Sequence, residues 1–185
     1  MKTSLLLMLA WCVVAARPAA AIDDRFNPHS YDNGGFAVAN DATYLKECGA
    51  CHFAYLPGML PARSWQKLLA TTDHFGEALA LDPAVAAQLS AYLMANAADH
   101  SDYRGSEAIL YRLGNDVTPL RITNLPVMRQ RHYIVSNLLH VNPKAGVKKL
   151  TNCNDCHEKA AAGSFAYREI VVPGISKVVK PGSLF

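Results

Sequence analysis

The chain has 185 residues, of which 18 are Lys or Arg and 15 are Asp or Glu, and 51% of its residues are hydrophobic. This length suits one domain or two small lobes. The longest basic run is Lys148-Lys149, and no basic patch is interleaved with aromatic residues, so nothing indicates nucleic acid binding.

Residues 1–21 have the pattern of a cleavable signal peptide. Lys2 provides a positive start, residues 5–16 form an apolar run, and residues 19–21 form an Ala-Ala-Ala cleavage site. The apolar run is too short and wrongly flanked for a membrane span. We therefore expect a mature chain that begins at Ile22 and is exported, in a bacterium to the periplasm.

Charge is distributed unevenly along the expected mature chain. Residues 22–107 carry 5 basic and 11 acidic side chains, a net charge of −6, whereas residues 108–185 carry 11 and 4, a net charge of +7. Such an asymmetry can give a folded protein a dipole that orients its encounters with charged partners. The alternative is that these are ordinary solvated faces.

The first elements follow this leader. Residues 22–40 contain glycines and a proline without a helical period, and they predict an extended loop. Asp41 is the predicted N-cap of a helix that runs into Cys48. Residues 53–61 hold two prolines and a glycine, so we expect an irregular apolar loop there.

Two longer helices are expected next. Ser64 is the predicted N-cap of a helix that carries an apolar stripe and ends near His74. Asp82-Pro83 combines a cap with a proline at the first helical position. It predicts the start of a helix that frays by residues 99–101.

Residues 102–106, where the charge changes sign, are the expected hinge between two halves. They divide the mature chain into an N-terminal lobe, residues 22–105, and a C-terminal lobe, residues 106–185. Ser106 is the predicted cap of a short helix that opens the second lobe and is ended by Gly114.

The longest helix expected in the second lobe spans residues 124–139. The spacing of its apolar residues places His132 on the apolar face. His140 lies at the frayed end of the same helix, and a basic loop follows it. Residues 170–173 then predict a short strand or an extended strap.

One pattern, Cys-x-x-Cys-His, occurs twice, at residues 48–52 and 153–157. Two thiols three residues apart on a helical turn can reach both vinyl groups of one porphyrin, and the next residue can ligate the iron from the same side. We therefore predict two haem c groups, with His52 and His157 as proximal iron ligands. The predicted thioether bonds involve Cys48, Cys51, Cys153 and Cys156.

Other uses of these cysteines are less consistent with the pattern. The fifth cysteine, Cys12, lies in the predicted signal peptide, so none remains for another role. A four-cysteine zinc site and a disulfide framework are the alternatives. The zinc site leaves unexplained the histidine after both pairs and the long gap between them, and two Cys-x-x-Cys pairs make a poor disulfide framework.

Each haem iron in an electron-transfer protein needs a second axial ligand. The candidates are His29, His74, His100, His132, His140, Met59, Met94 and Met128. Because no Met or His follows His157, the distal ligand of the second haem must come from upstream or be absent, which excludes a tandem of two ordinary cytochrome c domains. We predict His74 for the first haem and His132 for the second, with His140 as the alternative. The methionines are expected to fill gaps in the core.

Residues 48–65 (CGACHFAYLPGMLPARSW) and 74–77 (HFGE) resemble the bacterial dihaem cytochrome c family. The similarity continues through shorter segments, residues 120–123 (LRIT), 131–132 (RH), 152–153 (NC) and 163–173. The resemblance implies a periplasmic electron donor to a small oxygen-binding monohaem cytochrome c, with low-potential haems. It supports His74 and His132 as distal ligands, whereas residues 133–149 match the family poorly.

We therefore expect a mainly α-helical fold of short helices and long loops packed around two haems. The expected function is electron transfer from a membrane cytochrome to a soluble haem protein, with membrane contact only through a partner. The alternatives are a dihaem peroxidase and a haem gas sensor with one five-coordinate iron. The chain is short for a dihaem peroxidase, and no Glu or Gln stands out as a proton-handling partner at an open iron.

Overall fold

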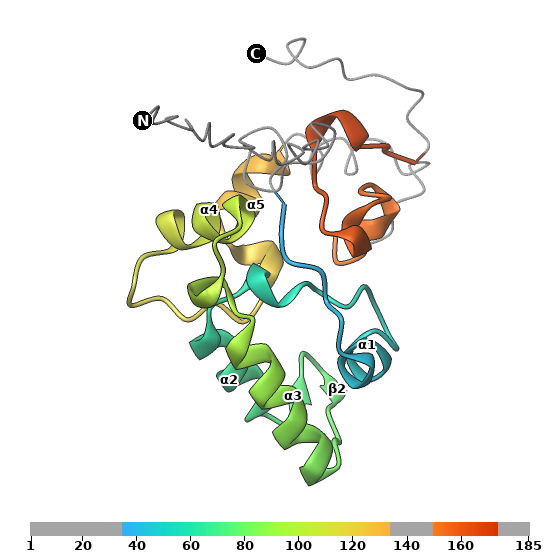
Figure 1. The fold of residues 1–185 in the computed structure, drawn as a ribbon, viewed down its shortest axis with the longest axis vertical. Coiled ribbons are helices and arrows are strands. Elements are labelled where there is room, and N and C mark those ends of the chain that lie inside the picture. Colours follow the sequence, from blue (N-terminus) through green and yellow to red (C-terminus); the bar gives the residue numbers. More distant parts are fainter. Residues whose placement is uncertain (1–34, 134–149, 174–185) are drawn as a thin grey trace, which may run out of the picture.

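The computed structural model describes residues 35–133 and 150–173 (Figure 1). These residues form short helices and turns with one small hairpin, which confirms the predicted, mainly helical fold class. None of the helices in these two ranges is long and apolar enough to cross a membrane. The predicted signal peptide, His29 and His140 lie outside the described residues.

The α-helices and strands of the described residues are α1 (Ala42–Cys48), α2 (Ala62–Leu69), β1 (Asp73–His74), β2 (Glu77–Ala78), α3 (Pro83–Ala95), α4 (Arg104–Leu113) and α5 (Pro126–Arg131). Short 3-10 turns connect them: η1 (Pro57–Met59), η2 (Ala98–His100), η3 (Ile122–Asn124), η4 (Cys153–Asp155), η5 (Ala160–Ala162) and η6 (Tyr167–Glu169).

Several helix ends lie where the sequence predicts them. The Asp41 carboxylate accepts a hydrogen bond from the backbone N–H of Tyr44 (2.7 Å) and caps α1. Asp82 caps α3 in the same way, accepting from Ala84 (2.8 Å). Gly114 ends α4 with φ of 75°, a conformation that glycine adopts without steric cost. These signals act within a few residues, and all three predictions are confirmed.

The predicted serine caps are wrong, because Ser64 and Ser106 lie inside helices and are buried. The N–H of Ala62, at the true start of α2, instead donates to the carboxylate of the distant Asp99 (2.8 Å). The Ser106 hydroxyl donates to the carbonyl of Gly58 (2.9 Å) and so joins α4 to η1. Partners far apart in sequence have replaced the local caps.

The prediction that the α2 helix reaches His74 is also wrong. The helix ends at Leu69, and β1 and β2 then pair antiparallel with His74 opposite Glu77. The two residues of the turn, Phe75 and Gly76, have φ of 62° and 100°. Positive φ at both positions is typical of tight turns that match the twist of a hairpin. His74 therefore projects from a short strand and not from a helix.

Helix α5 begins at Pro126 with Leu125 as its N-cap, so the predicted start at Asn124 is wrong. The helix ends at Arg131, and His132 is its C-cap residue. The rest of the predicted helix, residues 134–139, lies outside the described residues. A proline at the first helical position sets this start, because its missing N–H is not needed there.

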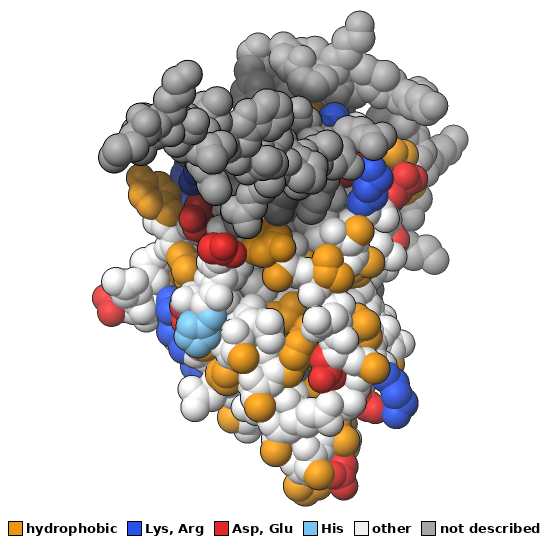
Figure 2. Space-filling view, viewed as in Figure 1, with side chains coloured by type: hydrophobic (Ala, Val, Ile, Leu, Met, Phe, Trp, Pro, Cys, Tyr) orange, Lys and Arg blue, Asp and Glu red, His pale blue; other side chains and the backbone are white. Residues whose placement is uncertain are grey.

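Acidic and basic side chains are interspersed on the face shown in Figure 2. Ion pairs such as Arg104–Glu107 (3.0 Å) and Lys159–Glu169 (2.7 Å) neutralise charges locally. The uneven charge along the sequence therefore does not separate the two signs on this face.

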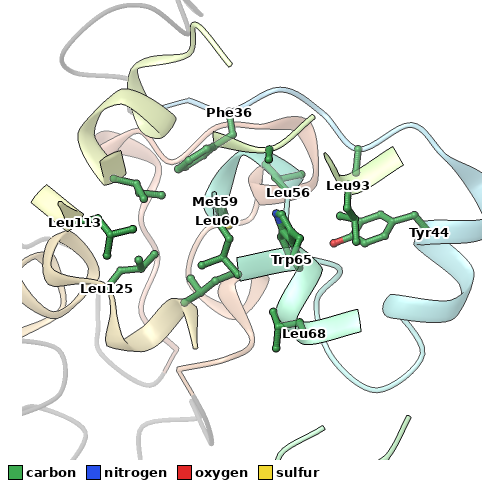
Figure 3. Close-up of a cluster of buried hydrophobic side chains, with 14 of the residues drawn as sticks. Phe36, Tyr44, Leu56, Met59, Leu60, Trp65, Leu68, Leu93, Leu113 and Leu125 are labelled. Carbon is green, nitrogen blue, oxygen red and sulfur yellow. The ribbon is translucent and has the colours of Figure 1, made fainter. Parts of the chain in front are cut away.

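A hydrophobic core gathers side chains from α1 to α5 (Figure 3). Met59 is completely buried in it, as predicted, and the indole N–H of Trp65 donates to the carbonyl of Pro57 (2.8 Å). The core includes side chains from both sides of the predicted lobe boundary at residues 105 and 106, which lies inside α4. The division into two lobes stays a prediction.

Residues 35–40 run through the middle of the molecule between α4 and the C-terminal segment (Figure 1). The N–H of Phe36 donates to the carbonyl of Gly163 (3.0 Å), and the N–H of Gly105 donates to the carbonyl of Gly35 (3.0 Å). The rings of Phe36 and Phe165 also meet edge to face at 5.4 Å. This segment ties α4 to the region of the second Cys-x-x-Cys-His motif.

Candidate haem sites

The first motif begins at the end of α1. Cys48 is the last helical residue and packs against the core, whereas Cys51 is exposed on the loop that follows. Burial, with a smaller contribution from Glu47, raises the pKa of the Cys48 thiol to about 11. The ring of His52 is partly buried, and its Nδ1 lies 2.8 Å from the carbonyl oxygen of Phe53.

His74 lies opposite His52. The ring centroids are 6.2 Å apart, and the ring planes differ by 21°. The Nδ1 of His74 is buried and has no hydrogen-bond partner among the described residues. Burial lowers the pKa of His74, with His52 and then Arg121 adding to the effect and Asp73 opposing it. Because buried polar atoms normally have partners, a ring of this kind fits a position facing a bound group.

The hairpin turn beside His74 contacts Arg121, which lies far along the chain. The Phe75 ring lies 4.8 Å from the His74 ring, and the guanidinium of Arg121 lies 3.7 Å from the Phe75 centroid. Positive φ is rare for a bulky residue and marks a constrained position. The cation–π contact with Arg121 holds this turn against the residues just before η3.

The second motif begins in a 3-10 turn, η4, whereas the first begins at the end of an α-helix. Burial raises the pKa of the Cys153 thiol to about 12, and it also raises that of Cys156. His157 is more shielded than His52: burial and then His132 lower its pKa to about 4. Ile170 forms a bridge with His157, and Val171 donates to the carbonyl of Cys156 (2.9 Å).

His132, at the end of α5, lies opposite His157. The ring centroids are 6.1 Å apart, and the ring planes differ by 71°. The Nδ1 of His132 lies 2.9 Å from the carbonyl oxygen of Met128 in the preceding helical turn. The structure thus brings together His52 with His74 and His157 with His132.

Both pairs have the geometry that a haem iron requires. With imidazole–metal bonds of about 2 Å, two imidazoles on opposite sides of one iron have ring centroids about 6 Å apart. A carbonyl at Nδ1 selects the tautomer whose Nε2 lone pair faces the metal, as in many metal sites. His52 and His132 have such carbonyls. The residues present therefore fit two haem groups, with two cysteines and a pair of histidines available at each site.

The two motifs lie next to each other. A cavity of about 360 Å³ is lined by residues 49–54, in and directly after the first motif, by Asn152, just before the second motif, and by Asn154 within it. The Tyr55 hydroxyl donates to the carbonyl of Thr151 (3.0 Å), which crosses between the two motif segments.

Two of the other candidates, His100 and Met59, have different surroundings. His100 is exposed, as predicted, with its Nδ1 2.7 Å from the carbonyl of Met94, and Met59 lies in the core. Within the described ranges, no three His, Cys, Asp or Glu side chains gather as a metal cluster would require. All four motif cysteines are described, so the zinc alternative has no support.

The sequence reasoning missed Tyr55, Phe75 and Arg121 as parts of these sites. Arg121 and Phe75 fall in the segments that carry the family resemblance, but neither has a spacing that predicts their contact. They are separated by 46 positions and meet only when the hairpin folds against the segment before η3.

Comparisons with known proteins agree with this geometry. A family model described as dihaem cytochrome c matches residues 44–165. A diheme cytochrome c from Rhodobacter sphaeroides is 39% identical with a TM-score of 0.57, and the match covers 69% of this chain and 98% of that one. A diheme cytochrome type c from Shewanella baltica OS155 is 30% identical with a TM-score of 0.58, and the match covers 75% and 97%. A search of curated proteins gave no match.

Proposed function

The chain belongs to the dihaem cytochrome c family, and from this we propose that it is an electron carrier in which each haem iron lies between two histidines. Two covalently attached haem c groups supply the one-electron redox chemistry. The polypeptide contributes the iron ligands, the burial and hydrogen bonds around them, and the surface that meets redox partners.

Each site uses residues from two parts of the chain. At the first, Cys48 and Cys51 hold the porphyrin edge, His52 is the proximal ligand and His74 the distal one. At the second, Cys153 and Cys156 hold the porphyrin, with His157 proximal and His132 distal. The observation that carries this assignment is the separation of the two imidazole pairs, 6.2 Å and 6.1 Å.

The same observation favours an electron carrier over an enzyme. A peroxidase or a gas sensor needs an iron with an open coordination position. Both motif histidines have a second imidazole at the distance of a second ligand, which supports a carrier whose two irons are ligated by the chain's own residues on both sides. Histidine in place of methionine also lowers the reduction potential, because methionine ligation raises it. Met59, buried in the core, is consistent with this.

Location and partners are part of the same proposal. The signal-peptide pattern of residues 1–21 supports a periplasmic protein. Its donor would be a membrane cytochrome and its acceptor a soluble haem protein. The net charges of −6 and +7 along the two halves support docking steered by charge. We expect docking rates to fall steeply with added salt, and rates that stay flat across ionic strength would contradict the steering.

The spin state of the oxidised protein tests the ligand assignment. Electron paramagnetic resonance and resonance Raman spectra should show only low-spin ferric haem. His74→Ala and His132→Ala should each convert one haem to high spin, whereas His100→Ala, a change at an exposed histidine, should convert none.

Two results would overturn parts of this assignment. A substantial high-spin signal in the unmodified protein would favour the peroxidase or sensor. If His140→Ala produces a high-spin haem and His132→Ala does not, the second distal ligand is His140.

A further inference from the structure

Tyr55 touches both Cys-x-x-Cys-His motifs. Its ring lies 5.0 Å from the ring of the proximal ligand His52, with a plane angle of 37°. Its hydroxyl donates to the carbonyl of Thr151 (3.0 Å), two residues before Cys153. One side chain thus contacts the iron-binding histidine of the first site and the segment that leads into the second.

Tyr55 is itself held firmly on the side of the first site. Its backbone carbonyl accepts a hydrogen bond from the hydroxyl of Tyr44, which is buried in the core. Its ring also meets Phe53 edge to face at 6.0 Å. These contacts fix the position from which the Tyr55 hydroxyl reaches the segment before Cys153.

The segment opposite is a short turn whose backbone hydrogen bonds, from the N–H groups of Asp155, Cys156 and His157, all stay within the turn. The 3-10 turn η4 begins after Asn152, which makes no capping hydrogen bond with its side chain. A turn of three residues has few internal hydrogen bonds, so contacts with other parts of the chain must fix its position. The hydrogen bond from Tyr55 joins residues 96 positions apart and is such a contact.

The phenol acts here as a hydrogen-bond donor. Its hydroxyl lies 3.0 Å from the carbonyl oxygen of Thr151, and a carbonyl oxygen can only accept. This favours a structural tie between the motifs and not a proton-transfer role.

We propose that Tyr55 is a positioning residue that sets the relative placement of the two haem sites and, through it, the rate of electron exchange between them. Exchange between two redox groups depends steeply on their separation and orientation. A hydrogen bond that fixes the second motif against the first proximal ligand controls both. The inference rests on the proposed function, since it assumes that electrons pass between the two haems.

The test is Tyr55→Phe, which removes only the hydroxyl and keeps the ring against His52. After one-electron reduction of the holoprotein by pulse radiolysis, we expect electron exchange between the two haems to be slowed several-fold. Both haems should remain low-spin in the variant, because the iron ligands are untouched. Hydrogen exchange of the amides around residues 151–157 should become faster as the tie is lost.

Two controls separate the tie from general effects of substitution. Tyr92→Phe removes a tyrosine hydroxyl whose hydrogen bond, accepted from the backbone N–H of Asn40 (3.1 Å), involves neither motif. Thr151→Ala keeps the carbonyl that Tyr55 uses. Both variants should exchange electrons at the unmodified rate.

An unchanged exchange rate in Tyr55→Phe, with both haems low-spin, would overturn the inference and leave the electron-carrier proposal standing. A change of spin state at the first haem in this variant would also overturn it, because Tyr55 would then support only His52. Failure of the proposed function looks different, since the unmodified protein would itself show high-spin haem or accept no electrons.

Discussion

The two histidine pairs have nearly the same separation, 6.2 Å and 6.1 Å, but different supports. At the first site, the distal histidine stands on a two-residue strand beside a constrained turn, and the proximal one follows a capped α-helix. At the second, the distal histidine caps the end of α5 and the proximal one follows a 3-10 turn. The separation is what one iron demands, whereas the backbone that provides it is free to differ.

The sites also differ in their relation to the core. Cys48 and Phe53 of the first site pack against the large hydrophobic cluster. The second motif contributes no buried member to that cluster, and it is held by residues 35–40, Phe165 and the bridge to Ile170. The first site is therefore packed directly against the hydrophobic core, whereas the second motif is connected to the rest of the protein by these separate contacts.

Removing each attachment in turn gives the largest expected contrast. Cys48→Ser with Cys51→Ser should leave the N-terminal half poorly folded, because the bound porphyrin completes the core around α1. Cys153→Ser with Cys156→Ser should leave α1 to α4 folded and disorder mainly the C-terminal segment. Haem content by mass spectrometry and amide hydrogen exchange measure both effects. A normally folded N-terminal half without its haem would contradict the comparison.

The attachment of the second site can be weakened at one residue. Gly163 has φ of 81°, and a Cβ there would overlap the backbone carbonyl of Phe36. Gly163→Ala should cost roughly 2–4 kcal/mol of unfolding free energy, from strain at positive φ and from the displaced carbonyl. Gly114→Ala is the matched control, since Gly114 has φ of 75° but nothing within 4 Å of its Cβ position. Equal losses in chemical denaturation would show that the contact with Phe36 adds nothing.

The positive charge of Arg121, near the proposed distal ligand His74, should affect the reduction potential of the first haem and not that of the second. A cation disfavours the ferric iron, so Arg121→Gln should lower the midpoint potential of the first haem. Because Arg121 is exposed and screened, we expect an effect of at most about 1 kcal/mol, roughly 40 mV for a one-electron couple. Arg121→Lys keeps the charge and should shift the potential less. The potentials are measured by spectroelectrochemical titration, and the Cys153→Ser, Cys156→Ser variant identifies which potential belongs to the second haem. A shift in the potential of the second haem instead of the first would contradict the prediction.

The smallest expected effect is a pH dependence confined to the second site. Hydrogen bonds from Lys159 and then Ser164 lower the pKa of Glu169 below its usual value. The stability that Glu169 adds is therefore present at neutral pH and lost as the pH falls below about 4.5. A partly exposed pair contributes a few tenths of a kcal/mol. Glu169→Gln should remove this dependence in denaturation curves measured between pH 7 and pH 3, and an unchanged curve would exclude the contribution.

Parts of this protein follow from sequence alone because the signals act within a few residues. Cys-x-x-Cys-His defines its own chemistry, Asp41 and Asp82 accept from N–H groups two or three residues later, and the end of α4 needs only a glycine at positive φ. Two haem groups and a mainly helical fold could be predicted on these grounds. The choice of His74 and His132 rested on spacing along the chain and on an apolar helix face; the structure brings both opposite the motif histidines, and their role as iron ligands stays a prediction.

Tertiary structure decided what depends on partners far apart in sequence. The carboxylate of Asp99, and not Ser64, accepts the hydrogen bond at the start of α2. The hydroxyl of the buried Ser106 donates to the carbonyl of Gly58 instead of capping α4. The hairpin under His74, the contact of Arg121 with Phe75 and the hydrogen bond from Tyr55 to Thr151 likewise have no local signal. The repeated motif determines that two haems are bound. Where they lie relative to each other is set by contacts that exist only once the chain has folded.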